Sequence, residues 1–334
     1  MKVPFLTRNV LPMPSKHGAS LPRREDRAKK TINSKVEKAH ELLNRMAEMY
    51  FRSGSVLVRP SSVDYNNVLH AISSSGLTSE ASARKADQLL SEMETKFKDG
   101  DTRVMPTAES YFNVIRAWNN CPDVETKLNG ALESIGRMKA QYEGGNDACK
   151  PTVHCYNAVI SVCRYRGFRT ASEDLKRKGL KTVAEMVKNM RKSPQTQPTS
   201  TTYYMLLEAF SVLLQRHSKE YERTIESIFH QCCREGLVDD RVVRTFNRLA
   251  PYESYRRTVL DAASPRLDDS SSDVSVMSNA LFLPSEWTRI TNPDIPLAID
   301  GTLDNQVQYR AAGKHKMRRL RRKHNQMLLH GGRD

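Results

Sequence analysis

Apolar residues recur along this chain with the spacing of one face of an α-helix. Four tyrosines are each followed by apolar residues three, four and seven positions later. The four copies are Tyr65, Val68, Leu69 and Ile72; Tyr111, Val114, Ile115 and Trp118; Tyr156, Val159, Ile160 and Cys163; and Tyr203, Leu206, Leu207 and Phe210. Side chains at these spacings share one side of a helix. Each copy therefore predicts an amphipathic helix.

A proline and a hydroxyl residue precede each of these helices. The phrase Pro-Ser/Thr-x3-Tyr begins at Pro60, Pro106, Pro151 and Pro198, at intervals of 46, 45 and 47 residues. Proline disfavours helical geometry in the residue before it, and Ser or Thr at an N-cap accepts a hydrogen bond from a free amide of the first turn. The phrase predicts where each helix begins, and its regular recurrence indicates an internal repeat.

A second stripe of the same spacing lies downstream in each unit. Its copies are Ala86, Leu89, Leu90 and Met93; Ala131, Ser134, Ile135 and Met138; Val183, Met186, Val187 and Met190; and Ile225, Ile228, Phe229 and Cys232. Similar stripes flank the four units, at Ala39, Leu42, Leu43 and Met46 and at Val242, Val243, Phe246 and Leu249. Each unit is thus a pair of amphipathic helices, which buries its apolar stripes only by stacking on neighbouring pairs.

This pattern predicts an all-α fold, an α-solenoid of helix-turn-helix repeats over residues 35–250. Four full repeats start near residues 60, 106, 151 and 198, with a half repeat at each end. Loops such as 143–147, which contain Gly and Asn, are expected between units because these residues permit tight turns. The basic stretch 164–178 of the third unit is expected to lie between its two helices.

The segments outside the array differ in composition. Residues 1–34 are basic and rich in proline at their start, which indicates either a disordered arm or a transit peptide. Residues 251–280 hold the end of the array and a Ser/Asp-rich linker that lacks the apolar content to fold. In the C-terminal segment, 281–334, the cluster 281–287 is apolar and is expected to dock on the last helices, and a basic tail follows.

Charge narrows the class of partner. The chain has 334 residues and a net charge of +15, which suits nucleic acid or an acidic membrane surface. No apolar stretch approaches the length of about 18 residues that a transmembrane helix needs, so we expect no membrane insertion. Six cysteines are too few for a disulfide scaffold, which indicates a reducing compartment.

The repeat resembles the pentatricopeptide repeat. Pro151, Thr152, Tyr156, Asn157 and Val159 of the third unit carry the resemblance best, together with the Tyr-Asn and the later Ala and Met of the first unit. It covers roughly residues 35–250. The resemblance implies a right-handed superhelix whose repeats each read about one base of single-stranded RNA.

In that family, one residue two places after the tyrosine and one at the end of the unit read a base together. The first set comprises Asn67, Asn113, Ala158 and Met205, and the second comprises Ala108, Val153 and Ser200. Within the first set only the two asparagines carry a side chain that pairs with a base edge. We therefore expect binding to RNA of low sequence specificity.

Two groups of residues are candidates for RNA contacts. The first group lies on the first helices of the units and comprises Asn67, His70, Asn113, Arg116, Asn120 and Arg164. The second is the basic tail, with Lys314, Lys316, Arg318, Arg319, Arg321, Arg322 and Lys323. For the first group the alternative is an ordinary solvated position; for the tail it is a nuclear localisation signal or a solvated face. The four repeat tyrosines begin the apolar stripes, which favours core packing over base stacking.

No catalytic, metal or cofactor signature stands out. His230, Cys232 and Cys233 lack a second pair of ligands at zinc-finger spacing. Asp268, Asp269 and Asp273 fall within the Ser-rich linker, where solvation explains them. We expect a protein that is not an enzyme and that needs no metal and no cofactor.

Repeats and charge together favour a non-catalytic RNA-binding adaptor. Its expected role lies in organellar RNA processing, stability, translation or ribosome assembly, with single-stranded RNA and ribonucleoprotein or ribosomal proteins as partners. Mitochondria are the expected compartment, with the plastid or the cytoplasm and nucleus as alternatives. A solenoid scaffold that binds proteins without reading RNA is the other hypothesis, because the base-reading positions match the family poorly.

Overall fold

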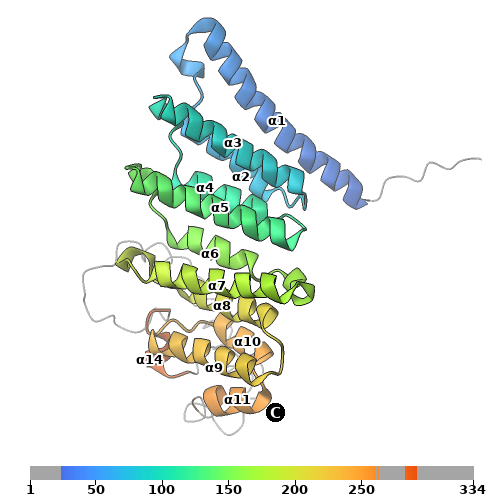
Figure 1. Ribbon diagram of the computed structural model, residues 1–334, viewed down its shortest axis with the longest axis vertical. Helices are drawn as coiled ribbons and strands as arrows, with labels where there is room; N and C mark the ends of the chain where they lie inside the picture. The colour runs from blue at the N-terminus through green and yellow to red at the C-terminus, as the bar shows by residue number, and fades with distance from the viewer. Residues whose placement is uncertain (1–23, 261, 263–282, 292–334) are drawn as a thin grey trace, which may run out of the picture.

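The computed structural model describes residues 24–260, 262 and 283–291, with side chains from residue 36 onward. Every regular element in this part of the chain is a helix, and it contains no β-strand. The helices pack in series along one axis from α1 to α11 (Figure 1). The all-α solenoid expected from the periodicity is confirmed. The first 23 residues, most of the linker and the basic tail with Lys314–Lys323 lie outside the described residues.

Two kinds of helix alternate along the chain. The first helices of successive units are α2 (Ser62–Ser74), α4 (Ala108–Asn119), α6 (Val153–Val162), α8 (Ser200–Leu213) and α10 (Asp240–Leu249). The second helices are α1 (Arg24–Ser53), α3 (Glu80–Lys98), α5 (Val124–Glu143), α7 (Glu173–Met190) and α9 (Lys219–Arg234). Helix α1 begins within the stretch expected to be the basic arm.

Short helical turns link these helices. They are η1 (Val56–Val58), η2 (Thr102–Val104), η3 (Asp147–Cys149), η4 (Arg166–Thr170) and η5 (Pro194–Thr196). At the C-terminal end, α11 (Tyr252–Tyr255) continues into the π-helical turn η6 (Arg256–Leu260). The loop at 144–146 lies between two units, as its composition predicts.

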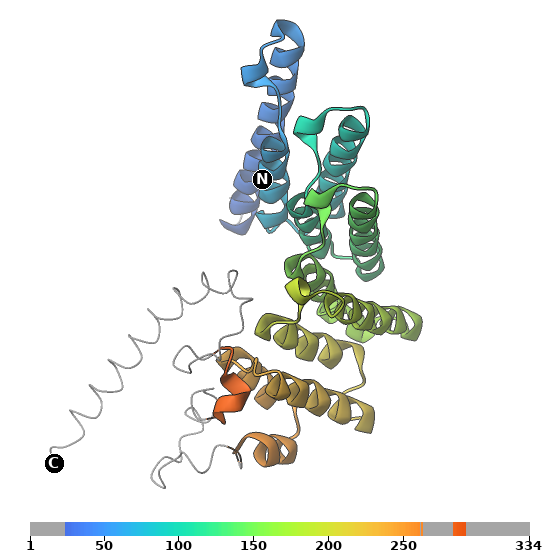
Figure 2. The ribbon, with the colours of Figure 1, turned by 90° about the vertical axis from the view of Figure 1, so that its left-hand side faces the viewer.

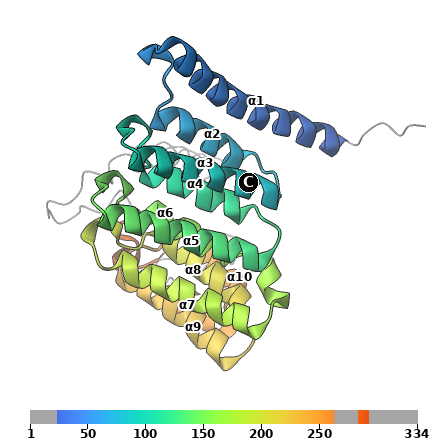
Figure 3. The same ribbon diagram turned by 45° about the horizontal axis from the view of Figure 1, so that its top comes forward.

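The first helices form one continuous layer. Helices α2, α4, α6, α8 and α10 contact one another in this order, and α3, α5 and α7 each contact the first helix of the next unit. Figures 2 and 3 show the resulting two-layer stack from the side and from a tilted view. Because every unit contacts mainly its neighbours, the layer of first helices presents a long surface along the array.

The predicted N-caps begin the first helices. Thr107, Thr152 and Thr199 each accept a hydrogen bond from the amide three residues later. At α2 the amide of Ser61 donates to the Asp64 carboxylate at 2.9 Å. These caps satisfy amides that the first turn leaves without partners, which is why the helix starts follow the repeated phrase.

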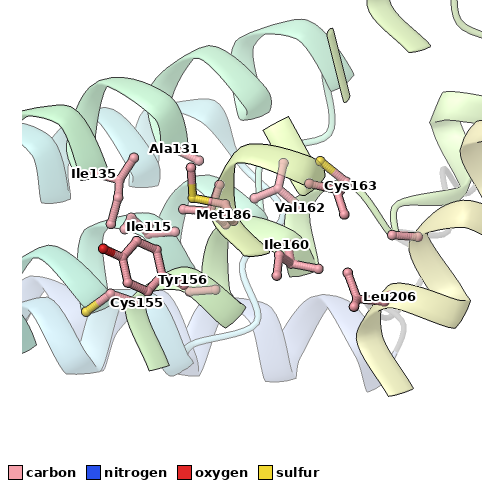
Figure 4. Close-up of a cluster of buried hydrophobic side chains, with 14 of the residues drawn as sticks. Ile115, Ala131, Ile135, Cys155, Tyr156, Ile160, Val162, Cys163, Met186 and Leu206 are labelled. Carbon is pink, nitrogen blue, oxygen red and sulfur yellow. The ribbon is translucent and has the colours of Figure 1, made fainter. Parts of the chain in front are cut away.

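The repeat tyrosines lie in the core, as predicted. Tyr65, Tyr111, Tyr156 and Tyr203 are all buried. Around Tyr156, Ile115 of α4, Ile135 of α5 and Met186 of α7 form a cluster that crosses unit boundaries (Figure 4). The apolar core is thus continuous along the array.

The basic segment of the third unit differs from the expectation. Residues 164–178 were expected to lie between the two helices, but α7 already begins at Glu173. Ser172 caps α7 by accepting a hydrogen bond from the Leu175 amide. The buried Phe168 in η4 fixes the short connection that remains.

Residues 283–291 pack against α9 near the C-terminal end of the array. They contain the short helix α14 (Ser285–Thr288). The Trp287 ring meets the Phe229 ring of α9 edge-on at 6.1 Å, and the amide of Val238 donates to the Trp287 carbonyl at 2.9 Å. The expected docking of the apolar cluster is confirmed for its described part.

No helix in the described ranges is long and apolar enough to cross a membrane.

Candidate nucleic-acid interface

The candidate interface is the side of the first-helix layer that faces away from the second helices. It is called the inner face below. Counted from each N-cap residue, it consists of positions 2, 5 and 9, which share one side of a helix. These are Val63, Asn66 and His70 on α2; Glu109, Phe112 and Arg116 on α4; His154, Asn157 and Ser161 on α6; Thr201, Tyr204 and Glu208 on α8; and Arg241, Arg244 and Arg248 on α10. All except the two asparagines are exposed or half-buried.

The position that reads a base in the resembled family lies one residue further, at position 6. Asn67 is exposed there and Met205 is half-buried, but Asn113 is 1% exposed and Ala158 is 7% exposed. Asn113 lies between α2 and α4, where its Oδ1 accepts a hydrogen bond from Ser73. Asn113 is therefore inaccessible to a base in this conformation, in contrast to its expected role. The close packing of neighbouring first helices buries this position.

The other candidate residues occupy different surroundings. His70 is exposed on α2. The Arg116 guanidinium lies 5.6 Å from the centre of the Phe112 ring. Asn120 caps the end of α4 and donates a 3.0 Å hydrogen bond to the Ser73 carbonyl, so its amide joins two first helices instead of facing a ligand. Arg164 lies just beyond α6 and contacts Tyr204 of α8.

Aromatic and polar side chains form pairs across neighbouring first helices. The Phe112 and His154 rings meet edge-on with centroids 6.4 Å apart. Nη2 of Arg164 donates to the Tyr204 hydroxyl at 2.7 Å. Of these residues, Phe112, His154 and Tyr204 were not among the candidates chosen from the sequence. The register counted from the N-caps would have found them at positions 2 and 5.

Charge is unevenly distributed along the inner face. Its N-terminal half carries the single pair Glu109 and Arg116, whereas α10 alone contributes Arg241, Arg244 and Arg248. The acid Glu208 of α8 forms an ion pair with Arg248. The C-terminal half of this face therefore attracts anions more strongly than the N-terminal half.

The sequence around the third unit adds to this asymmetry. Between residues 164 and 192 there are ten lysines and arginines, against the three acids Glu173, Asp174 and Glu185. Two of these acids form ion pairs within α7, with Lys176 and Arg177. The remaining basic side chains place positive charge on the same half of the molecule.

No metal site accompanies the interface within the described residues, where no three His, Cys, Asp or Glu side chains gather. Cys232 and Cys233 are buried among apolar side chains of α9, while His230 is exposed. Burial raises the pKa of the Cys233 thiol to about 12, so the thiol stays protonated at neutral pH.

Comparison with known proteins supports the repeat assignment. Over 172 aligned residues the chain is 25% identical to a chloroplastic pentatricopeptide repeat-containing protein of Arabidopsis thaliana, with 45% of this chain and 19% of that protein covered. The matched stretch thus spans about a fifth of the relative's length. No protein-family profile matches the chain, and no solved structure matches it at a significant level. The chain is thus distantly similar, over part of its length, to a pentatricopeptide repeat-containing protein, and its helices pair in series.

Proposed function

We propose that this protein is a non-catalytic adaptor that binds single-stranded RNA along the inner face of its helical array. The observation that carries the proposal is the row of half-buried and exposed arginine and aromatic side chains along the first-helix layer, from Phe112 and Arg116 to Tyr204 and Arg241. Arginine binds phosphate through two parallel hydrogen bonds and also stacks on bases. Aromatic rings stack on any base.

Binding of this kind has low sequence specificity. Base identity is read through hydrogen bonds to base edges, and three of the four base-reading positions are buried or apolar: Asn113, Ala158 and Met205. Phosphate contacts and stacking are insensitive to base identity. The protein therefore holds RNA for other factors instead of selecting a short sequence by itself.

An organellar role in RNA processing, stability, translation or ribosome assembly is consistent with these features. The Arabidopsis relative is chloroplastic. The first 24 residues of this chain hold five basic residues and no acid, as transit peptides do. Neither observation favours mitochondria over plastids, so the proposal is limited to an organelle. The basic tail, with Lys314–Lys323, supplies further phosphate contacts in this account.

Salt-dependent binding tests the proposal. Full-length protein is titrated into labelled single-stranded RNAs of unrelated sequence, and fluorescence anisotropy gives Kd at several salt concentrations. We expect similar Kd values for all sequences and a logarithmic salt slope of about −3, as four to five phosphate contacts produce on a single strand. Absence of binding at low salt, or binding of only one sequence, would contradict the proposal.

A protein-binding scaffold is the second candidate. Apolar side chains are exposed at the N-terminal end of the array, where Leu42 is 61%, Phe51 90% and Leu57 94% exposed. Such a patch is typical of a protein interface. Partners that co-purify after ribonuclease treatment, from a protein that fails to crosslink to RNA, would favour this function over the first.

A further inference from the structure

Tyr204 brings two arginines from different helices together on the inner face. The Arg164 guanidinium carbon lies 4.7 Å from the centre of the Tyr204 ring, and that of Arg241 lies 4.6 Å from the same centre. The two guanidiniums are therefore no more than about 9 Å apart. This cluster, called the Arg-Tyr-Arg cluster, combines α6, α8 and α10.

Each member of the cluster is held by the repeat geometry. Tyr204 is at position 5 of α8, Arg241 is at position 2 of α10, and Arg164 directly follows α6. Arg164 donates to the Tyr204 hydroxyl at 2.7 Å, and Arg241 donates to the Thr201 hydroxyl at 2.6 Å. These bonds restrict both long side chains, which lowers the entropic cost of ordering them around a ligand.

Within the described ranges, no acidic side chain pairs with the positive charge of the cluster. Neither Arg164 nor Arg241 forms an ion pair with a described residue, whereas Arg248 on the same face pairs with Glu208. The Asp239 carboxylate caps α10 by accepting from the Val242 amide. In addition, the buried Nε of Arg164 has no hydrogen-bond partner. Two permanently charged groups held close together repel each other. An anion between them attracts both and so offsets their repulsion.

Among anions, a phosphate group is suited to contact two guanidiniums at once. Its oxygens point in several directions, and each accepts charge-assisted hydrogen bonds of about 2.8 Å from guanidinium nitrogens. One phosphate thus bridges two arginines that a carboxylate, with both oxygens on one side, meets less well. A phosphodiester keeps two such oxygens, one for each guanidinium, and its single negative charge offsets one of the two positive charges.

We propose that Arg164, Tyr204 and Arg241 form a binding site for one phosphodiester group of single-stranded RNA, which anchors the strand on the C-terminal half of the inner face. The proposal rests on the proposed function, since it assigns the strongest contact within that interface. The site recognises the backbone and is insensitive to base identity. Its three residues are different from those at the base-reading positions of the resembled repeat.

Charge-neutral variants of the full-length protein test the site. We expect R164Q/R241Q to weaken binding to all single-stranded RNAs about 10- to 30-fold at moderate salt and to reduce the salt slope by about 0.7, because one phosphate contact on a single strand contributes about that much. Tyr204→Phe keeps the ring and removes the acceptor for Arg164, so a smaller loss of about 2- to 5-fold is expected. Thermal unfolding of each variant checks that the array remains folded.

Arg223→Gln is the matched control, because it removes an exposed arginine from the second helix α9. It should change Kd less than 2-fold. Wild-type-like Kd and slope in the double variant, with salt-dependent binding by the wild type, would overturn the site and leave the proposed function standing. A wild type that binds no RNA would overturn both. A further outcome is that millimolar AMP displaces RNA from the wild type and has no such effect on R164Q/R241Q. This result would assign the site to a free nucleotide instead of a strand.

Discussion

At the scale of single residues, Lys127 is the clearest departure from the regular pattern. This lysine of α5 is 2% exposed, and its ammonium lies 3.5 Å from the centre of the Tyr165 ring. It forms no salt bridge with a described residue. Burial lowers its pKa from 10.5 to about 8, because the charged form loses its hydration. The cation-π contact compensates only part of this cost.

Replacing Lys127 by methionine should therefore stabilise the fold at neutral pH. Between the folded pKa of about 8 and the unfolded value of 10.5, the unfolded chain binds more protons, so the wild type gains stability as the pH rises. We expect the free energy of unfolding of Lys127→Met to be about 1–3 kcal/mol higher than that of the wild type at pH 7. The difference should shrink by about 2 kcal/mol at pH 9.5. Urea unfolding at both pH values measures it.

Lys181→Met, at an exposed position of α7, is the control for removing a charge. If Lys127→Met and the wild type differ by the same free energy of unfolding at both pH values, the Lys127 ammonium is not a buried charge that destabilises the fold.

Some residue-scale features could be predicted from the sequence and others could not. The burial of the repeat tyrosines follows from the stripes that they begin. The burial of Lys127 and Asn113 does not, because it depends on how closely neighbouring helices approach one another. Lysine and asparagine side chains are usually exposed to solvent, so their types alone give no sign of burial.

At the scale of elements, the approach of α5 to α4 is set by a glycine. A Cβ placed on Gly130 would lie 2.3 Å from Cδ2 of Trp118, so only glycine allows this contact. On the same helix, Gly136 has no atom within 4 Å of such a Cβ. An alanine at position 130 therefore tests the packing against Trp118, whereas an alanine at position 136 tests helix propensity alone.

Gly130→Ala should destabilise the protein by about 1–3 kcal/mol, because the Trp118 ring must move out of a well-packed site. Gly136→Ala, as the matched variant, should stabilise it by about 0.5–1 kcal/mol through the higher helix propensity of alanine. Thermal unfolding of the two variants compares them. Equal effects of both substitutions would contradict the packing of α4 on α5.

The start of each first helix was predictable, because the cap residue and the proline act locally. The start of α7 was missed. Its cap, Ser172, is followed by the acids Glu173 and Asp174, which suit a helix N-terminus, but the basic residues around them dominated the interpretation.

At the scale of the whole molecule, the solenoid follows from the repeat, whereas the location of the binding surface does not. The net charge of +15 indicates an anionic partner without placing it. The structure brings Arg164 onto the same half of the inner face as Arg241 and Arg244 of α10, so two distant sequence segments meet there. The sequence lacks this information because the face exposed by the first helices depends on the angle at which they stack.

Ultraviolet crosslinking of the full-length protein to a single-stranded RNA, followed by mass spectrometry of the crosslinked peptides, tests the central claim most directly. The account predicts crosslinks on the inner face of the first helices, strongest in the peptides that contain Tyr204, His154 and Phe112. Crosslinks confined to the second helices α3, α5, α7 and α9, or to residues outside 24–291, would contradict it.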